Sequence, residues 1–361
     1  MRGSFRPQPV VETSMDEHKK IAVVLFQLGG PDSLAAVEPF LYNLFSDPDI
    51  IALPLGRFAR LPLARLIASA RAKKLRNAYA AIGGKSPIGD LTRRQARALE
   101  LELRKEIDAK VFVAMRYWHP LTEEAVAELR AAPFHELVLL PLYPQYSKTT
   151  TGSSWNEWNR KYRPAAGNHL PVRWVRHFYN HPSYIDALVE KVNRQLERFA
   201  SPKDVHLVFS AHGVPASVIE SGDPYQEQVE ATRKLVVERG RWPCPHILCY
   251  QSRVGPGRWL EPGLHATIHS LAANGAKNVL VIPVSFVSDH IETLNEIDIE
   301  VRAEAMRLGI THFEMMPALN DSPKFIRALA ELVWQAVGLL QGKEGYVESS
   351  KTENRDLPPA T

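Results

Sequence analysis

The stretch Asn278-Val279-Leu280-Val281-Ile282-Pro283-Val284-Ser285-Phe286-Val287 runs directly into Ser288-Asp289-His290-Ile291-Glu292-Thr293-Leu294-Asn295-Glu296-Ile297-Asp298-Ile299-Glu300. The first part is apolar and rich in β-branched residues, which predicts a buried strand of a parallel sheet. The second part has the spacing of a helix. A helix that opens after such a strand lies at the carboxyl edge of the sheet, where α/β proteins place their ligand sites. This junction therefore predicts an α/β fold and the position of a site in it.

The second part carries a row of carboxylates. Asp289, Glu292, Glu296 and Glu300 fall at spacings of three and four residues, so they would share one helix face. Like charges four residues apart cost a helix about 0.2–0.5 kcal/mol per pair, so the row needs a compensating cation or a functional reason. Carboxylates beside the imidazole of His290 also suit a divalent first-row metal. An ordinary solvated helix face is the alternative interpretation.

The bulk composition is that of a soluble globular protein. The chain has 361 residues, enough for two domains, of which 45% are hydrophobic and 23% charged. The sequence contains no run of about 18–20 apolar residues, as a membrane-spanning helix would need. Residues 1–20 mix basic and acidic side chains and lack the apolar core of a secretory signal. We therefore expect a cytoplasmic protein of bacterial type.

The charge is unevenly distributed. The net charge of +4 is too small to indicate nucleic-acid binding, but residues 50–89 contain eight basic residues, no acidic residue and many leucines. Such a segment can rest on an anionic membrane surface or attract an acidic, apolar ligand. A solvated helix with one-sided charge explains it equally well.

The two cysteines, Cys244 and Cys249, exclude a disulfide framework as the organising principle. Their spacing, with His246 between them, resembles half of a metal clip. A closed zinc site needs four ligands at tighter spacing, and the sequence offers no second half. We therefore expect reduced thiols.

Strand-like apolar runs alternate with helical patterns along the chain, which predicts parallel sheets with crossover helices on both faces. Two pairs of runs resemble each other, so the economical interpretation is an α/β protein of two similar Rossmann-like domains with a cleft between them. The expected strands are Ile21–Leu28, Val111–Tyr117, Glu136–Tyr143, Val205–Ser210, His246–Gln251 and Asn278–Val287. The expected domains are 19–179 with 322–341, and 180–321, flanked by a flexible N-terminus (1–18) and a disordered tail (342–361).

Polar and aromatic residues follow several of these strands. His212 comes after a buried strand in a Ser-Ala-His-Gly turn, a position that favours function and a structural histidine about equally. A hydrolase interpretation of Ser210 and His212 is weak, because the chain has no Gly-x-Ser-x-Gly elbow. Gly29-Gly30-Pro31 lacks the dinucleotide and phosphate fingerprints and predicts a tight turn that a flat ligand can approach. The loop 143–155, together with 115–120, would supply aromatic walls and a cation to a pocket.

Seven motifs, in order along residues 21–340, resemble those of the ferrochelatase family. They are Gly29-Gly30-Pro31-Asp32, Gly83-Gly84-Lys85-Ser86-Pro87-Ile88, Arg116-Tyr117, Tyr143-Pro144-Gln145-Tyr146-Ser147, Phe209-Ser210-Ala211-His212-Gly213-Val214-Pro215, Gly222-Asp223-Pro224-Tyr225 and Ser288-Asp289-His290-Ile291-Glu292-Thr293-Leu294.

This resemblance implies a chelatase-like fold and the insertion of Fe²⁺ into protoporphyrin IX, the last step of haem biosynthesis, with release of two protons. His212 and Glu292 match the family's paired active-site residues, which face each other across the macrocycle and are the expected catalytic and metal-contacting residues. Two pyrrole protons must leave as the metal enters, so a base has to lie near the ring centre.

The resemblance also assigns supporting residues. A relay for protons or hydrated metal would include Asp289, His290, Glu296 and Glu300, on a helix that the family often distorts toward π geometry. Positions that contact the porphyrin would be Leu28, Tyr79, Ser86, Arg116, Tyr117 and Trp259. The basic segment after residue 50 matches the family's lip, which implies transient peripheral contact with a membrane.

The chain departs from some relatives. Lys148 stands where the upstream cysteine of an iron–sulfur cluster would be, so we expect no [2Fe–2S] cluster and no tightly bound cofactor. Leu28 replaces a tyrosine usual in relatives that metallate coproporphyrin, which favours protoporphyrin IX. A cobalt-inserting chelatase, a porphyrin or haem carrier and a periplasmic-type metal-binding protein are the competing hypotheses.

Overall fold

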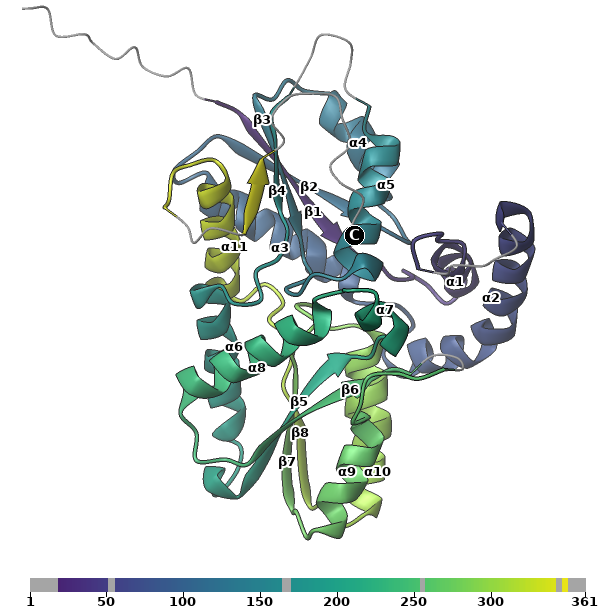
Figure 1. Ribbon diagram of the computed structural model, residues 1–361, viewed down its shortest axis with the longest axis vertical. Helices are drawn as coiled ribbons and strands as arrows, with labels where there is room; N and C mark the ends of the chain where they lie inside the picture. Colours follow the sequence, from purple (N-terminus) through teal and green to yellow (C-terminus); the bar gives the residue numbers. More distant parts are fainter. Residues whose placement is uncertain (1–18, 51–55, 164–169, 254–256, 342–345, 350–361) are drawn as a thin grey trace, which may run out of the picture.

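The computed structural model describes residues 19–50, 56–163, 170–253, 257–341 and 346–349, and these form two twisted sheets with helices around them (Figure 1). The first sheet has the strand order β2-β1-β3-β4-β9, and all pairs except β4–β9 are parallel. Its strands are β1 Ile21–Gln27, β2 Ala109–Met115, β3 Glu136–Pro141, β4 Val172–Val175 and β9 Val347–Ser349. Its part of the chain also contains α1 Val37–Phe45, α2 Gly56–Ala81, α3 Ile88–Leu103, α4 Thr122–Arg130, the π-helix η1 Lys148–Gly152 and α5 Ser153–Lys161.

The second sheet has the order β6-β5-β7-β8 and is parallel throughout. Its strands are β5 Val205–His212, β6 His246–Gln251, β7 Asn278–Pro283 and β8 His312–Met315. Its helices are α6 Pro182–Leu196, the short 3₁₀ turn η2 Pro202–Asp204, α7 Ala216–Glu220, α8 Tyr225–Gly240, α9 Leu264–Ala273, the π-helix η3 Glu292–Val301 and α10 Arg302–Arg307. In both sheets the first four strands along the chain lie in the same spatial order: second, first, third, fourth. This confirms the expected similarity of the two halves.

Alternating side chains on the strands divide the core into three layers. Val23 and Leu25 of β1 and Leu207 and Phe209 of β5 belong to one shared core, which also contains the apolar face of the last helix, α11 Pro323–Ala336. The opposite face of the first sheet packs against α4 and α5, and that of the second against α9, η3 and α10. The side chains on both faces of β1 and β3 are buried without a break, as a parallel sheet between helices requires. The α/β prediction is confirmed, and α11 packs back onto the first half as expected.

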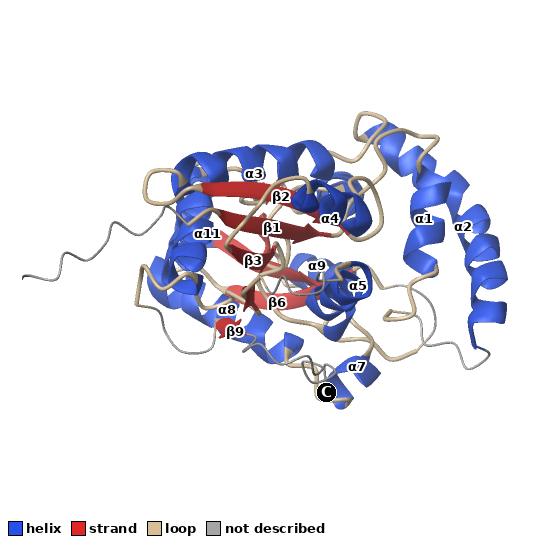
Figure 2. Cartoon of the chain, turned by 90° about the horizontal axis from the view of Figure 1, so that it is seen from above, coloured by secondary structure: helices blue, strands red, loops and turns tan. Residues whose placement is uncertain are grey.

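Helices α1 and α2 stand apart from both sheets at one side of the molecule, as two perpendicular views show (Figures 1 and 2). We call these two helices the lip. They pack on each other and on a small apolar cluster that includes Tyr79 and Tyr117. Ile291, just before η3, also packs against this cluster, so the lip touches the second half at the acidic helix. In the described part of the chain, no helix is both long and apolar enough to span a bilayer.

Two sequence expectations are wrong. The stretch from Thr149 to Trp155 is not a loop but the π-helix η1 running into α5, begun by the Ser147 side chain, which accepts a hydrogen bond from the Thr149 amide. The tail is not disordered throughout: β9 pairs antiparallel with β4, and Tyr346 before it is buried. An exposed sheet edge favours such an added strand. Residues 1–18, 342–345 and 350–361 lie outside the described residues.

Candidate functional site

His212 is the last residue of β5, and its backbone is fixed on both sides. Its amide donates to Ser285 Oγ at 2.8 Å, and its carbonyl accepts from the Tyr225 hydroxyl at 3.0 Å. The next residue, Gly213, lies so close to the neighbouring strand that a Cβ there would meet the Gln251 carbonyl oxygen at 2.7 Å. The glycine of the Ser-Ala-His-Gly turn is therefore needed for this close approach.

Glu292 opens η3 after β7, and its carboxylate meets the histidine. The distance from His212 Nδ1 to Glu292 Oε2 is 2.9 Å, and the two side chains are 34% and 24% exposed. Burial acts to lower the pKa of His212, but the Glu292 carboxylate outweighs it and raises that pKa. Burial acts to raise the pKa of Glu292, yet the His212 cation holds it well below its usual range. The pair is thus an ion pair that leaves His212 Nε2 as the ring nitrogen for a substrate. Because only 2.9 Å separates the two side chains, no macrocycle lies between them, so the expectation that they face each other across the ring is wrong.

Ser252 joins this pair to the next carboxylate, and sequence reasoning did not find it. Its hydroxyl lies 3.0 Å from Glu292 Oε2 and 2.5 Å from Glu296 Oε2, and its amide donates to Glu296 Oε1 at 2.9 Å. Its φ of +64° is in the left-handed region, which a side chain other than glycine rarely adopts. Burial and the nearby charge of Glu292 raise the pKa of Glu296. The only available signal was its place directly after strand β6.

The predicted row of four carboxylates is interrupted. The helix begins at Ile291, so Asp289 precedes it, and the expectation that Asp289 lies on the helix is wrong. The Asp289 carboxylate instead accepts hydrogen bonds from the Ala318 amide at 3.0 Å and from Asn320 Nδ2 at 2.7 Å. The expected π geometry is confirmed over Glu292–Val301. Glu300 is exposed and accepts from Asn295 Nδ2, so the carboxylates run from the half-buried pair toward the surface.

His290 is buried beside the pair. Its Nδ1 lies 3.2 Å from the Ser288 carbonyl oxygen, which assigns the proton to that nitrogen. Its Nε2 lies 3.9 Å from Glu292 Oε2 and has no hydrogen-bond partner within the described residues. The ring packs on Phe286, with 4.2 Å between the ring centroids. His290 thus offers an unpaired nitrogen next to Glu292.

The residues expected to contact a porphyrin divide into two groups. Leu28 is half-buried beside the lip, and Trp259 bridges to Pro215, just after His212, so both lie where a flat ligand could be held. Ser86 lines a pocket of about 240 Å³. The pocket lining is Gly30, Asp32, Lys85, Ser86, Gly89, Asp90, Arg93, Trp118, His119, Pro120 and Glu124.

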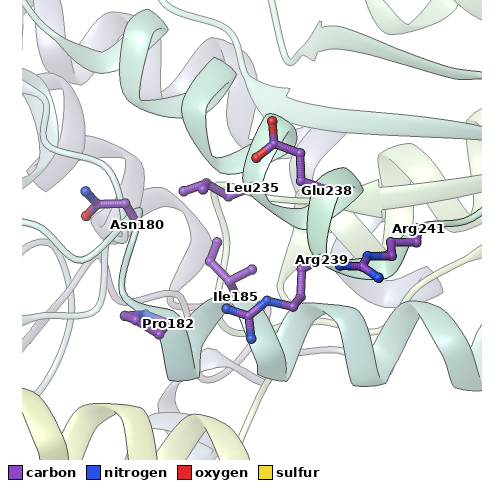
Figure 3. A pocket seen from close by; sticks show the side chains of 7 residues that line it. All are labelled: Asn180, Pro182, Ile185, Leu235, Glu238, Arg239 and Arg241. Atoms are coloured by element: carbon purple, nitrogen blue, oxygen red, sulfur yellow. The ribbon is translucent and has the colours of Figure 1, made fainter.

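Tyr79, Arg116 and Tyr117 form the second group, and their side chains are largely enclosed by protein. Tyr79 and Tyr117 lie in the lip cluster, and the Arg116 side chain is only 10% exposed. Another pocket, of about 460 Å³, lies between α6 and α8 and contains none of the predicted residues (Figure 3).

Opposite this site, the first half provides hydrogen bonds that hold the two halves together rather than reactive side chains. Gln145 Nε2 donates to the Val284 carbonyl oxygen at 3.1 Å and to Thr232 Oγ1 at 3.0 Å. The buried Asp223 carboxylate accepts from Ser147 Oγ at 3.0 Å and from the Lys148 amide at 2.7 Å. These bonds join the segment after β3 to α8 and the end of β7. Two quoted motifs, 143–147 and 222–225, therefore hold the halves together.

Comparison with known proteins gives the family. The family model described as ferrochelatase matches residues 20–337. The chain belongs to the ferrochelatase family. A ferrochelatase of Geotalea daltonii is 50% identical over 322 residues, which cover 89% of this chain and 99% of the relative. One of Aquifex aeolicus is 49% identical over 315 residues, covering 87% and 98%. The chain is thus an enzyme of the metal-chelatase class, as the resemblance implied.

Solved structures agree on the fold. SirB from Bacillus subtilis, solved with Fe³⁺, has a TM-score of 0.52 at 12% identity, covering 89% of this chain and 96% of that one. A multi-domain protein of Deinococcus radiodurans with structural similarity to chelatases has a TM-score of 0.51 at 13% identity, covering 89% of this chain and 55% of its own. The two-domain chelatase fold is therefore confirmed.

Proposed function

We propose that this ferrochelatase-family enzyme inserts Fe²⁺ into protoporphyrin IX, with His212 and Glu292 at the centre of the ring. The observation that carries the proposal is the 2.9 Å pair of His212 Nδ1 and Glu292 Oε2, held at the carboxyl ends of two adjacent strands and partly open to solvent. A base at the ring centre is what the reaction demands, because each pyrrole N–H must lose its proton as the metal enters.

The charge state of the pair suits a metal that arrives as a dication. Before metal arrives, the proton resides on His212, as the raised pKa of this histidine and the lowered pKa of Glu292 indicate. Metal ligands must be deprotonated, so Fe²⁺ approaching the pair favours release of that proton. Among the described residues, no group of three or more His, Cys, Asp or Glu side chains could hold a metal. A contact by two side chains leaves iron free to pass to the four pyrrole nitrogens.

Released protons have a path toward the surface. Ser252 links Glu292 to Glu296, and Glu300 lies exposed farther along η3. In this proposal Glu296 and Glu300 carry protons away from the ring, and His290 Nε2 adds a second acceptor beside Glu292. Asp289 takes a positioning part, since its oxygens already bind the 318–320 loop.

The proposal extends to cofactor and location. It includes no iron–sulfur cluster: the four-thiolate ligand set of such clusters exceeds the two cysteines of this sequence, and Cys249 is buried. It places the enzyme in the cytoplasm with α2 against an anionic membrane face. Supporting this, Leu66 is 68% exposed on α2 between basic side chains, among them Arg65 and Arg71. Binding to vesicles with and without anionic lipid would test the contact.

The decisive experiment mixes purified protein anaerobically with protoporphyrin IX and Fe²⁺ and follows metalloporphyrin absorbance. We expect turnover by the unchanged chain and a loss of at least about a hundredfold in kcat for His212→Ala. His269→Ala is the matched control, because His269 also pairs with a carboxylate, Glu304 at 2.7 Å, but on the exposed side of α9. Porphyrin binding without turnover by the unchanged chain would indicate a carrier, and turnover with Co²⁺ alone would indicate a different chelatase.

A further inference from the structure

Asp47 is the most completely enclosed carboxylate among the described residues, and sequence reasoning gave it no part. It lies in the turn that follows α1, just before the segment that leads to α2, and its side chain is 0% exposed. Moving a carboxylate out of water is costly unless hydrogen bonds and an opposite charge compensate it. The contacts of Asp47 therefore show what this turn is built to hold.

Three side chains from the body of the first half converge on this carboxylate. Asp47 Oδ2 accepts from the Tyr117 hydroxyl at 2.6 Å and from Ser153 Oγ at 2.6 Å. Asp47 Oδ1 lies 2.8 Å from Arg116 Nη2, and Arg116 Nε donates to Ser153 Oγ at 2.9 Å. The Arg116 guanidinium thus binds Asp47 and its partner Ser153, and its Nη2 also lies 3.9 Å from Asp49 and 4.0 Å from Glu157.

Two neighbours of Asp47, one in α1 and one in the turn, also bind the body of the first half. Asn43 of α1 donates to the Tyr117 carbonyl oxygen at 3.1 Å. Asp49 binds α5 through Asn156 Nδ2 at 3.1 Å and Arg160 at 2.7 Å. Bonds from α1 and from the turn after it therefore attach this region to the segment after β2 and to α5.

Tyr117 connects this network to the lip itself. Its ring lies in the apolar cluster with Phe40 of α1 and Ala68, Ala72 and Tyr79 of α2. Its hydroxyl binds Asp47. A single residue thus joins the packing of both lip helices to the buried ion pair.

We infer that Asp47 is a positioning residue that holds the lip at a fixed place over the porphyrin cleft, with Arg116 and Tyr117 acting through it. This inference rests on the proposed function only in taking the ligand of the cleft to be a porphyrin. It assigns the Arg116 charge to neutralising Asp47 rather than to binding the substrate directly. Loss of the Asp47 contacts loosens the lip, which receives the porphyrin, while the reacting pair His212 and Glu292 stays in place.

The test compares Asp47→Asn with the unchanged chain, because asparagine keeps the size and removes the charge. We expect the dissociation constant for protoporphyrin IX without metal, and KM, to rise about tenfold, since a charge-assisted bond is lost. We expect kcat to change less than about twofold, because no group at the ring centre is altered. Amide exchange measured by mass spectrometry should accelerate in 37–45 and 60–81 and stay unchanged in 205–212.

Two further variants keep the inference open to refutation if Asp47→Asn folds poorly. Tyr117→Phe removes only the hydroxyl and should give a smaller rise in KM with the same exchange pattern. Arg116→Met combined with Asp47→Asn should cost less than the sum of the single changes, because it also removes the buried cation that has lost its nearest carboxylate. Asp186→Asn is the control, since it breaks an exposed ion pair at 2.5 Å with Arg239, which lines the pocket between α6 and α8 (Figure 3).

A fall in kcat with unchanged porphyrin affinity, or unchanged exchange in the lip, would overturn the inference. Failure of the proposed function looks different. In that case the unchanged chain itself would bind porphyrin and form no metalloporphyrin, while affinity and lip exchange would still decide the part played by Asp47.

Discussion

The two halves of this chain share one strand order but differ in what they carry at the ends of corresponding strands. In the second half, β5 ends in His212 and β7 leads to Glu292, and both side chains are partly exposed. In the first half, β1 leads to Gly29 and β3 to Gln145 and Ser147. The Gln145 and Ser147 side chains are buried, and both donate hydrogen bonds to the second half. The two similar halves thus have different roles: the second half presents the reactive groups, and the first half holds them in position.

This difference follows from the cost of leaving polar groups unpaired. A buried amide or hydroxyl that finds partners across the cleft stabilises the relative position of the halves. A carboxylate and an imidazole that keep some exposure, with one lone pair or proton free, remain available for chemistry. The comparison predicts that changes in the second half affect turnover and that changes in the first half affect stability or substrate affinity.

Glu292→Gln should give the largest effect. The amide keeps the shape but cannot take a proton, so we expect kcat to fall about 10²–10⁴-fold with little change in melting temperature. Gln145→Leu is the counterpart after β3 and should do the reverse, lowering the melting temperature and sparing kcat. Metallation rates and thermal melts of both variants check this. A large loss of kcat in Gln145→Leu would break the division between the halves.

Asp223→Ala should give the second-largest effect, on stability. The Asp223 carboxylate accepts hydrogen bonds of 3.0 Å or less from the Ser147 hydroxyl and from the Lys148 and Tyr225 amides. The alanine variant removes this acceptor from all three donors. We expect a loss of about 2–4 kcal/mol in the free energy of unfolding, measured by urea denaturation. Asp204→Ala, an exposed carboxylate, is the control. Unchanged stability in Asp223→Ala would mean that the tie between the halves contributes little.

Ser252 sharpens the comparison within the second half. Ser252→Ala and Ser252→Gly both remove the hydroxyl that joins Glu292 and Glu296, but only glycine relieves the φ of +64°. We expect kcat to fall about tenfold in both, because one hydrogen bond to a charged group is lost. Steady-state rates with saturating porphyrin measure this. A loss confined to the alanine variant would assign the effect to backbone strain instead.

The sequence predicted the architecture well because the long strands are buried on both faces and read as apolar runs. Strands β4, β8 and β9 went unpredicted because each has only three or four residues, too few to show a period. They form by pairing with a strand already in place. Tyr346, directly before β9, is buried, and the local sequence pattern does not reveal this.

The site was predicted unevenly for a related reason. His212 and Glu292 stand at strand ends, where position alone indicates function, and the structure brings them together; their roles stay predictions. Asp47 and Ser252 have side-chain partners 40 to 106 residues away, so no local pattern marks them. Asp289 was placed on the helix by spacing alone, whereas its carboxylate is held by a loop that only the fold brings near.

The smallest effect concerns the fifth strand of the first sheet, since the second sheet has four strands in the part of the chain that the structure describes. Burial, with a smaller contribution from Arg176, lowers the pKa of His177 to about 4, and its ring packs at 6.0 Å from Tyr346 before β9. The unfolded chain takes up a proton near pH 6.5 and the folded chain near 4, so stability is full above pH 6.5 and falls as pH drops from 6.5 toward 4. At the other sheet edge, Arg302 donates to the Phe313 carbonyl oxygen of β8 and needs no such histidine.

We therefore expect His177→Gln to reduce the difference in melting temperature between pH 7.5 and pH 5 by a few degrees. Amide exchange at pH 5 should be faster in 347–349 than at pH 7.5 after correction for intrinsic rates, with 312–315 unaffected. His206 is a useful control, since its pKa is also lowered by burial but it lies on β5, away from the added strand. Equal acceleration at both sheet edges would show that acid loosens the whole molecule. A change confined to 347–349 would place the acid-sensitive edge in the positioning half, away from the reactive pair.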